Sequence, residues 1–240
     1  MQPEPSGFAT DDPRVAERFA QLAVELHHRP GLADTAEAVV NFALQALGCR
    51  YAGIALAARG HHTEIGAVTD VVVQTVYEAQ TTTGEGPMLT AMANRIVVVI
   101  PDVSAEARWP RWREHALALG IGSVLHVPMV TRTQTVGVLS LYHDKPHAFS
   151  DDDEAIAHIL AQHACVAVAT ARQDETMAQA IDARRLVGQA LGILMERFAI
   201  DDTRAFAILK RYSQDTNTKL RDVAHHLIDT RKLPDPPRPE

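Results

Sequence analysis

Length, composition and charge narrow the classes of protein to which this chain can belong. With 240 residues, 46% of them hydrophobic and 22% charged, the chain can bury a full core and is typical of globular proteins. Its apolar runs are far shorter than the ~20 residues of a membrane span, and its first residues do not resemble a signal peptide. We therefore expect a cytoplasmic protein with no membrane partner. The net charge of −7 argues, for the chain as a whole, against nucleic-acid binding.

The first two thirds of the chain alternate between helical and strand patterns. An apolar stripe predicts a helix within an N-terminal segment of residues 1–31, at Val15, Phe19, Leu22 and Leu26. Further helices are predicted at residues 33–47, 71–81, 87–93 and 109–119. Segments rich in β-branched residues predict strands at residues 51–58, 63–69, 96–99, 123–130 and 134–142.

The order of these elements predicts the fold class of the first domain. The last two strands are separated by the short polar link Thr131, Arg132 and Thr133, which favours an antiparallel hairpin. Helices mixed among antiparallel strands are typical of an α+β fold. We predict one such domain at residues 32–172, with an antiparallel sheet flanked by helices.

A long helical pattern follows Ser150. Ser150 is a good N-cap, acidic residues fill the first turn, and no proline interrupts the pattern up to Phe198. The sequence therefore predicts one helix, or two nearly collinear ones, over residues 151–198. In its second half, apolar residues at alternating spacings of three and four predict the dimer seam of a coiled coil, formed by Met177, Val187, Leu191 and Leu194.

Two features bear on that seam. Arg184 falls within it by spacing, which weakens the pattern. The alternative to a homodimer is a single amphipathic helix that folds onto its own domain. If the coiled coil forms, the long helix connects the α+β domain to the helical segments at the end of the chain.

Two short helical patterns complete the chain and predict, with the end of the long helix, an all-α domain at residues 173–233. Asp201 or Asp202 caps the first, whose apolar face is Ala205, Phe206, Leu209 and Tyr212. Asn217 or its threonine neighbours cap the second, whose apolar face is Leu220, Val223, Ala224, Leu227 and Ile228. Residues 234–240 are a polar, proline-rich tail that we expect to be disordered.

Charge is distributed unevenly along the chain. Residues 1–170 contain 11 Lys and Arg against 19 Asp and Glu, whereas residues 171–233 contain 11 against 9. Hydrogen-bond donors gather where the two short helices meet, at Lys210, Arg211, Ser213, Gln214, Asn217, Lys219 and Arg221. Such side chains neutralise phosphate and bond the base edges of RNA loops. An ordinary solvated helix surface is the alternative.

The motif that begins at Arg184 carries a family resemblance. The segments RRLVGQALGILM (184–195), DTRAF (202–206) and SQDTNTKLRDVA (213–224) together resemble the ANTAR family. The resemblance implies a three-helix module that binds paired RNA stem-loops as a dimer and thereby promotes transcription antitermination. We predict as its RNA-binding residues Arg185, Gln189, Arg211, Ser213, Gln214, Asn217, Lys219 and Arg221.

One position departs from the ANTAR pattern. The family commonly has a lysine where this chain has Leu191, between Ala190 and Gly192. The change could weaken RNA binding, alter the RNA target, or reflect packing in the dimer seam.

The preceding domain resembles the GAF family. The resemblance rests on Gly84-Glu85-Gly86-Pro87 and on the step Ile100-Pro101-Asp102-Val103. It implies a sensor with a small-molecule ligand that the sequence does not identify. His126 could in principle bind haem, although a strand histidine bonded to its neighbours is the more ordinary role.

An enzyme and a DNA-binding regulator are the two other classes of function to which the sequence could belong. Catalysis lacks residues to perform it: Cys49 and Cys165 are expected to be buried thiols in helices, no phosphate-binding glycine motif occurs, and His143 with His147 lacks a third metal ligand. We therefore expect no enzyme activity and no metal site. A ligand-responsive DNA-binding transcription factor is the second class, because the link between the last two helices could be the turn of a helix-turn-helix motif.

Overall fold

The computed structural model describes residue 17, residues 31–58 and residues 63–233. The described residues form two compact units, which divide between Arg172 and Gln173. The tail predicted at residues 234–240, and all but residue 17 of the helix predicted around Val15 to Leu26, lie outside the described residues.

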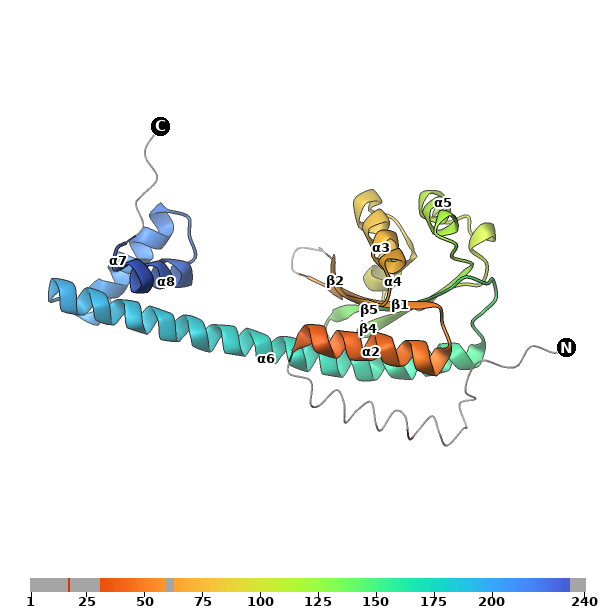
Figure 1. Ribbon diagram of the computed structural model, residues 1–240, viewed down its shortest axis with the longest axis horizontal. Coiled ribbons are helices and arrows are strands. Elements are labelled where there is room, and N and C mark those ends of the chain that lie inside the picture. The colour runs from red at the N-terminus through yellow and green to blue at the C-terminus, as the bar shows by residue number, and fades with distance from the viewer. Residues whose placement is uncertain (1–16, 18–30, 59–62, 234–240) are drawn as a thin grey trace. The chain divides into compact units, whose positions relative to one another are not determined.

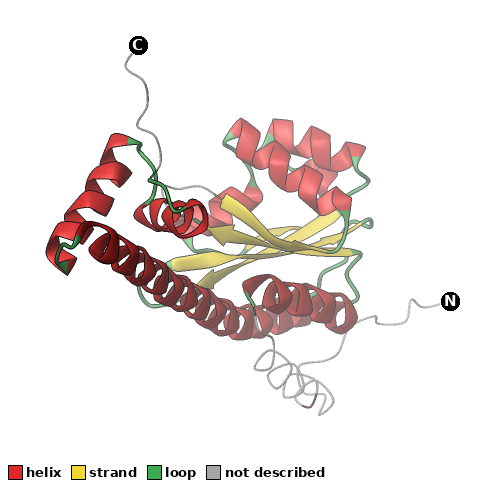
Figure 2. Ribbon diagram, turned by 60° about the vertical axis from the view of Figure 1, so that its left-hand side comes forward, coloured by secondary structure: helices red, strands yellow, loops and turns green. Residues whose placement is uncertain are grey.

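The first unit is built on a five-stranded antiparallel sheet (Figures 1 and 2). Its strands lie in the order β2-β1-β5-β4-β3, and their bounds are β1 Tyr51–Ala57, β2 Thr63–Val68, β3 Val98–Ile100, β4 Ser123–Val130 and β5 Thr135–His143. Strands β4 and β5 form the predicted hairpin, in which Val130 pairs with Thr135. Strand β3 begins two residues later than predicted, because its pairing with β4 starts at Val98 opposite His126. The α+β prediction is confirmed.

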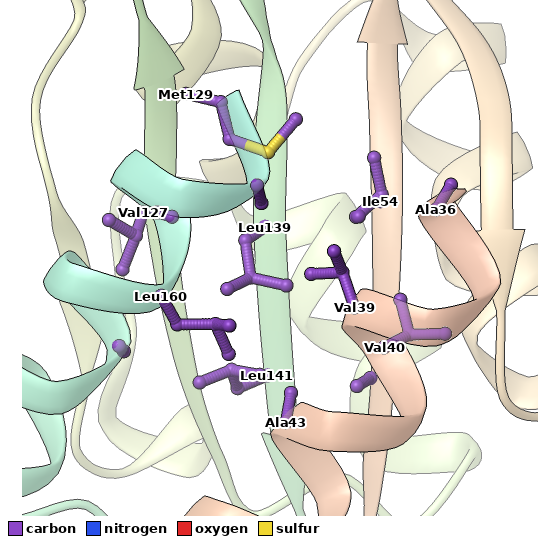
Figure 3. Close-up of a cluster of buried hydrophobic side chains, with 14 of the residues drawn as sticks. Ala36, Val39, Val40, Ala43, Ile54, Val127, Met129, Leu139, Leu141 and Leu160 are labelled. Carbon is purple, nitrogen blue, oxygen red and sulfur yellow. The ribbon is translucent and has the colours of Figure 1, made fainter. Parts of the chain in front are cut away.

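Helices cover both faces of this sheet (Figure 1). Helix α2 (Leu32–Leu47) and the start of α6 (Asp151–Phe198) pack on one face. Figure 3 shows their side chains, such as Val39 and Leu160, meeting Leu139 and Leu141 of the sheet. Helices α3 (Val71–Thr83), α4 (Pro87–Asn94) and α5 (Pro110–Ala118) cover the other face. Each large apolar side chain buried in these layers contributes about 1.5–3 kcal/mol to folding.

The two sequence motifs of the first unit have structural roles. Gly84 ends α3 and Gly86 precedes α4, both at positive φ, and Pro87 occupies the first turn of α4. Gly86 has φ 150, and a Cβ there would collide with the buried side chain of Gln80, whose Oε1 accepts a hydrogen bond from Met88 N. The Asp102 carboxylate caps the short 3-10 helix η2 (Val103–Ala105) by accepting from Ser104 N.

Helix α6 is one uninterrupted element of 48 residues. Within the described residues it is long and apolar enough, by length and composition, to cross a membrane. Ile156, Leu160 and Ala164 of α6 are buried against the sheet, whereas Ile159 and Val166 are exposed, and the first turn of the helix carries four acidic residues. One side of the helix is thus part of the core of the first unit.

The second unit is a three-helix module. The end of α6 packs with α7 (Asp202–Asp215) and α8 (Leu220–Thr230) around the fully buried residues Ala190, Leu194, Ala205, Leu209, Val223, Ala224 and Leu227. Asp201 caps α7 as predicted, since its carboxylate accepts a hydrogen bond from Arg204 N.

Two expectations for this module are wrong. Lys219, and neither Asn217 nor a threonine, is the residue that precedes α8, and no side chain caps that helix. Asn217 instead has a left-handed backbone, with φ 48, within the turn between the helices. Phe206 was expected in the core, but 42% of it is exposed, because α7 turns this position away from the buried residues Ala205 and Leu209.

Candidate functional site

The junction of α7 and α8 is fixed by hydrogen bonds within its own turn. Ser213 Oγ donates to the carbonyl oxygen of Thr218 at 2.7 Å, and Thr218 N donates to the carbonyl oxygen of Ser213 at 3.1 Å. The Thr216 hydroxyl donates to the Tyr212 carbonyl oxygen at 2.7 Å. This bonding occupies the Ser213 proton, so that Ser213 shapes the turn and retains only acceptor capacity for a ligand.

Six of the eight predicted RNA-binding residues lie in this short stretch of chain, and two lie on α6. Arg211, Ser213 and Gln214 belong to the end of α7, Asn217 and Lys219 to the turn, and Arg221 to the first turn of α8; Arg185 and Gln189 are the two on α6. All except Ser213 are exposed. The structure therefore places a donor-rich, solvent-accessible surface where the sequence predicted it.

Three arginines of this set have acidic neighbours. Arg211 is 3.4 Å from Asp215, Arg221 is 3.1 Å from Asp222, and Arg185 is 3.5 Å from Asp182. The side chains of each pair are about half exposed or more. Ion pairs at such exposed positions add little to the stability of a protein in water. A phosphate group can compete for these guanidinium groups at small cost.

A groove in the same module was not foreseen. It has a volume of about 430 Å³ and is lined by Ala183, Arg184, Val187, Gly188 and Leu191 of α6, Phe206 of α7, and Leu220 and Arg221 of α8. Its walls are apolar except for the two arginines. We call it the Arg184–Arg221 groove.

The sequence missed this groove because spacing alone does not tell which side of a helical stripe is covered. The spacing predicts Phe206 in the core, whereas it is exposed at the groove, and it makes Arg184 an exception within the seam. The presence of one arginine within an otherwise apolar stripe was the signal that could have revealed it.

The predicted dimer seam divides into three kinds of position. Met177 is 63% exposed and remains available to a partner. Val187 and Leu191 are half-buried and line the groove. Leu194 is fully buried in the three-helix core, so its assignment to the seam is wrong. Ile181, which the prediction left out, is as exposed as Met177 and lies one turn from it on α6.

The first unit contains a cluster of buried polar side chains on the α3–α5 side of its sheet. It is formed by Tyr77 of α3, Trp112 of α5, His126 of β4, and Ser140 and Tyr142 of β5. His126 and Ser140 are direct partners across the β4–β5 ladder, and His126 Nδ1 lies 2.8 Å from Ser140 Oγ. The His126 ring meets the Tyr142 ring edge to face, with 5.6 Å between centroids.

Four polar atoms of this cluster lack a hydrogen-bond partner among the described residues. They are Tyr77 Oη, Trp112 Nε1, His126 Nε2 and Tyr142 Oη. The Tyr77 and Tyr142 hydroxyls lie close enough to Ser140 and to each other to influence their pKa values, yet neither phenol forms a hydrogen bond of regular geometry. Buried polar atoms without partners are costly and rare in folded proteins. These unpaired atoms make the cluster a candidate site for a small polar ligand in the first unit.

Burial makes every titratable group in the cluster electrically neutral. It lowers the pKa of His126 from its usual 6.5 to about 3. Burial also raises the pKa of Tyr77 and Tyr142 above that of an ordinary tyrosine. A bound ligand would thus meet neutral donors and acceptors rather than charges. His126 was expected to form hydrogen bonds with its neighbours in the sheet. Its Nδ1 does so, whereas its Nε2 has no partner among the described residues.

The buried His126 predicts an acid sensitivity of the first unit. Because His126 takes up a proton near pH 6.5 when unfolded but only near pH 3 when folded, protonation favours the unfolded chain. The free energy of unfolding should fall as the pH is lowered from about 6.5 toward 3, by up to about 1.4 kcal/mol per pH unit from this group. Urea unfolding at several pH values should show a shallower dependence in His126→Gln. Equal slopes in the two proteins would contradict the assignment.

Within the described parts of the chain, the cysteines and histidines form no site of another kind. Cys49 lies just after α2 rather than within it, and burial raises the pKa of its thiol to about 12. Burial also raises the pKa of the Cys165 thiol. Neither thiol is an effective nucleophile at neutral pH. His143 Nδ1 is 2.8 Å from Asp144, and among the described residues no three His, Cys, Asp or Glu side chains gather as metal ligands.

Comparison with protein families agrees with both units. The fold is that of an α+β domain followed by a small helical module. Residues 30–169, more than half of the chain, match the GAF domain family, and residues 175–228 match the ANTAR domain family. The chain belongs to the GAF family and carries an ANTAR domain after its GAF domain. It is a sensory regulator of the GAF-ANTAR architecture.

Solved structures share the fold of the first unit. The GAF domain of a phosphoenolpyruvate-protein phosphotransferase from Coxiella burnetii is 19% identical, with a TM-score of 0.56, over 70% of this chain and 99% of that one. The free methionine-R-sulfoxide reductase from Neisseria meningitidis is 16% identical, with a TM-score of 0.51, over 70% and 98%. At these identities the likeness shows the GAF fold alone. A comparison with curated proteins finds no match.

Proposed function

We propose that the protein binds RNA stem-loops in nascent transcripts through its ANTAR domain and thereby promotes transcription antitermination. The observation that carries this proposal is the exposed, donor-rich junction of α7 and α8, where Lys219 and Arg221 directly follow a turn held by its own hydrogen bonds. A rigid turn presents its donors without a large loss of conformational entropy on binding. Phosphates and the bases of an RNA loop are ligands that match such donors.

The functional form in this proposal is a homodimer that pairs along α6. Exposed apolar side chains on this helix support it, namely Ile159 and Val166 seven residues apart, and Met177 and Ile181 four residues apart. Spacings of four and seven place residues on one face of a helix, as in coiled coils. Two copies would offer two RNA-binding modules to paired stem-loops.

The GAF domain supplies the input in this proposal. The buried cluster around His126 and Tyr142 supports a small, uncharged ligand, since its unbonded atoms belong to neutral side chains. The same neutrality and the raised pKa values of both thiols support a binding role rather than an enzymatic one. A cytoplasmic location follows from the proposed action on nascent transcripts.

A binding competition tests the proposed function. Full-length protein is titrated into a labelled RNA hairpin with a randomised loop, and unlabelled hairpin or duplex DNA is added as competitor. We expect the RNA hairpin to compete at least tenfold better, because the donors of the junction suit unpaired bases. Stronger competition by duplex DNA would favour a DNA-binding transcription factor instead. Absence of binding to either nucleic acid would reject the proposal.

A further inference from the structure

We propose that the Arg184–Arg221 groove receives an unpaired base of the RNA loop while its two arginines bind the adjoining phosphates. This inference rests on the proposed RNA-binding function and adds a site and a mode of recognition to it. The volume of about 430 Å³ is within the range of about 300–1,000 Å³ that is usual for small-molecule sites. A single nucleotide is a ligand of that class.

The groove walls fit an aromatic base better than a sugar or a phosphate. Val187, Leu191 and Leu220 offer only hydrocarbon, and the exposed ring of Phe206 offers a flat surface for stacking. Stacking of a base on an aromatic side chain is favourable for every base because each has a π-face. Apart from the arginines, no lining side chain can bond a base edge. We therefore infer that the groove requires a base but tolerates any of the four.

The charge at the rim identifies the occupant as anionic. Arg184 is exposed and has no ion pair among the described residues of the module. Arg221 forms an ion pair there only with Asp222, which is itself exposed. A ligand whose apolar part fills the groove binds most tightly if it also carries negative charge beside the two arginines. A nucleotide has both features. A second copy of the chain seated there by two-fold symmetry would bring four arginines together, which is unfavourable.

Gly188 and Gly192 provide a matched pair of variants for the test. Both lie on α6, one turn apart, and a Cβ added at either meets nothing within 4 Å. Only Gly188 lines the groove. Leucine at either position improves helix propensity equally. Gly188→Leu therefore fills the groove, whereas Gly192→Leu makes the same chemical change outside it.

The experiment measures hairpin and duplex binding by the full-length proteins. The probes are an RNA hairpin with a randomised loop and a blunt RNA duplex of the same stem. For Gly188→Leu we expect about tenfold weaker hairpin binding and little change in duplex binding, with Gly192→Leu equal to the wild type. Equal hairpin binding by both variants would overturn the groove proposal while leaving RNA binding intact. No RNA binding by the wild type would overturn the proposed function itself.

Two further measurements keep the test decisive. Sedimentation of Gly188→Leu should show an unchanged oligomeric state, and loss of a dimer would assign the groove to a second copy instead. Crosslinking of wild-type protein to hairpins that contain 4-thiouridine in the loop should label residues 183–191, Phe206, Leu220 or Arg221. Labels confined to other parts of the chain would overturn the proposal even if the variant failed to fold.

Discussion

Leu194→Ala should unfold the ANTAR module while the GAF domain remains folded. Leu194 is fully buried among residues of all three helices of a small core, and removal of a buried leucine side chain costs about 2–5 kcal/mol. A module of this size has little stability to lose. Amide hydrogen exchange should accelerate throughout α7 and α8, while the strands of the sheet keep their protection, because the two units share no core residues.

Leu191→Ala is the matched control for this prediction. Leu191 is half-buried and lines the groove, so its truncation should leave exchange in α7 and α8 nearly unchanged. If Leu194 belonged to a dimer seam, Leu194→Ala would weaken dimerisation and leave exchange within the module as it was. The comparison thus separates a core role from an interface role.

Lys219→Ala combined with Arg221→Ala should weaken binding to RNA hairpins about tenfold or more. Each cation that contacts a phosphate releases counterions, so its removal lowers the slope of log affinity against log salt by about 1. Both side chains are exposed, and their removal leaves the buried residues untouched. Titrations at several salt concentrations measure both the loss of affinity and the change in slope.

A second double variant controls for the loss of charge. Arg204→Ala with Lys232→Ala removes the same two charges from exposed positions of the same module, away from the α7–α8 turn. It should change the salt slope far less. Equal effects of the two double variants would show that general electrostatic attraction, rather than this junction, holds the RNA.

Most of the architecture was predictable from local patterns. The strand pattern of β4 and β5, their short link, and the uninterrupted helical pattern after Ser150 each reflect the pleat or the helical repeat directly. What failed depends on contacts between distant parts of the chain. The choice between Leu194 and Ile181 as an outward position depends on which side of α6 the helices α7 and α8 cover, and spacing alone does not give this.

The candidate sites divide in the same way. The donors at the α7–α8 junction are close in sequence, so their clustering was visible before the fold. Tyr77, Trp112 and Tyr142 are far apart in sequence and meet only because α3 and α5 cover the same face of the sheet as the side chains of His126 and Tyr142. Leu191, which replaces the lysine common in the family, lines the groove. The effect of this replacement on RNA binding therefore depends on whether the groove contacts RNA.

Because both cysteines are buried, an oxidant would react first with another side chain. Their thiols stay protonated at neutral pH and are therefore poor targets for peroxide. A thioether needs no deprotonation to react, and Met177 is the most exposed methionine in the part of the chain that the structure describes. Conversion of Met177 to its sulfoxide would place a strong dipole on the apolar face of α6. If two copies pair along α6 as proposed, oxidants would thereby weaken their association before they reached the core of the first unit.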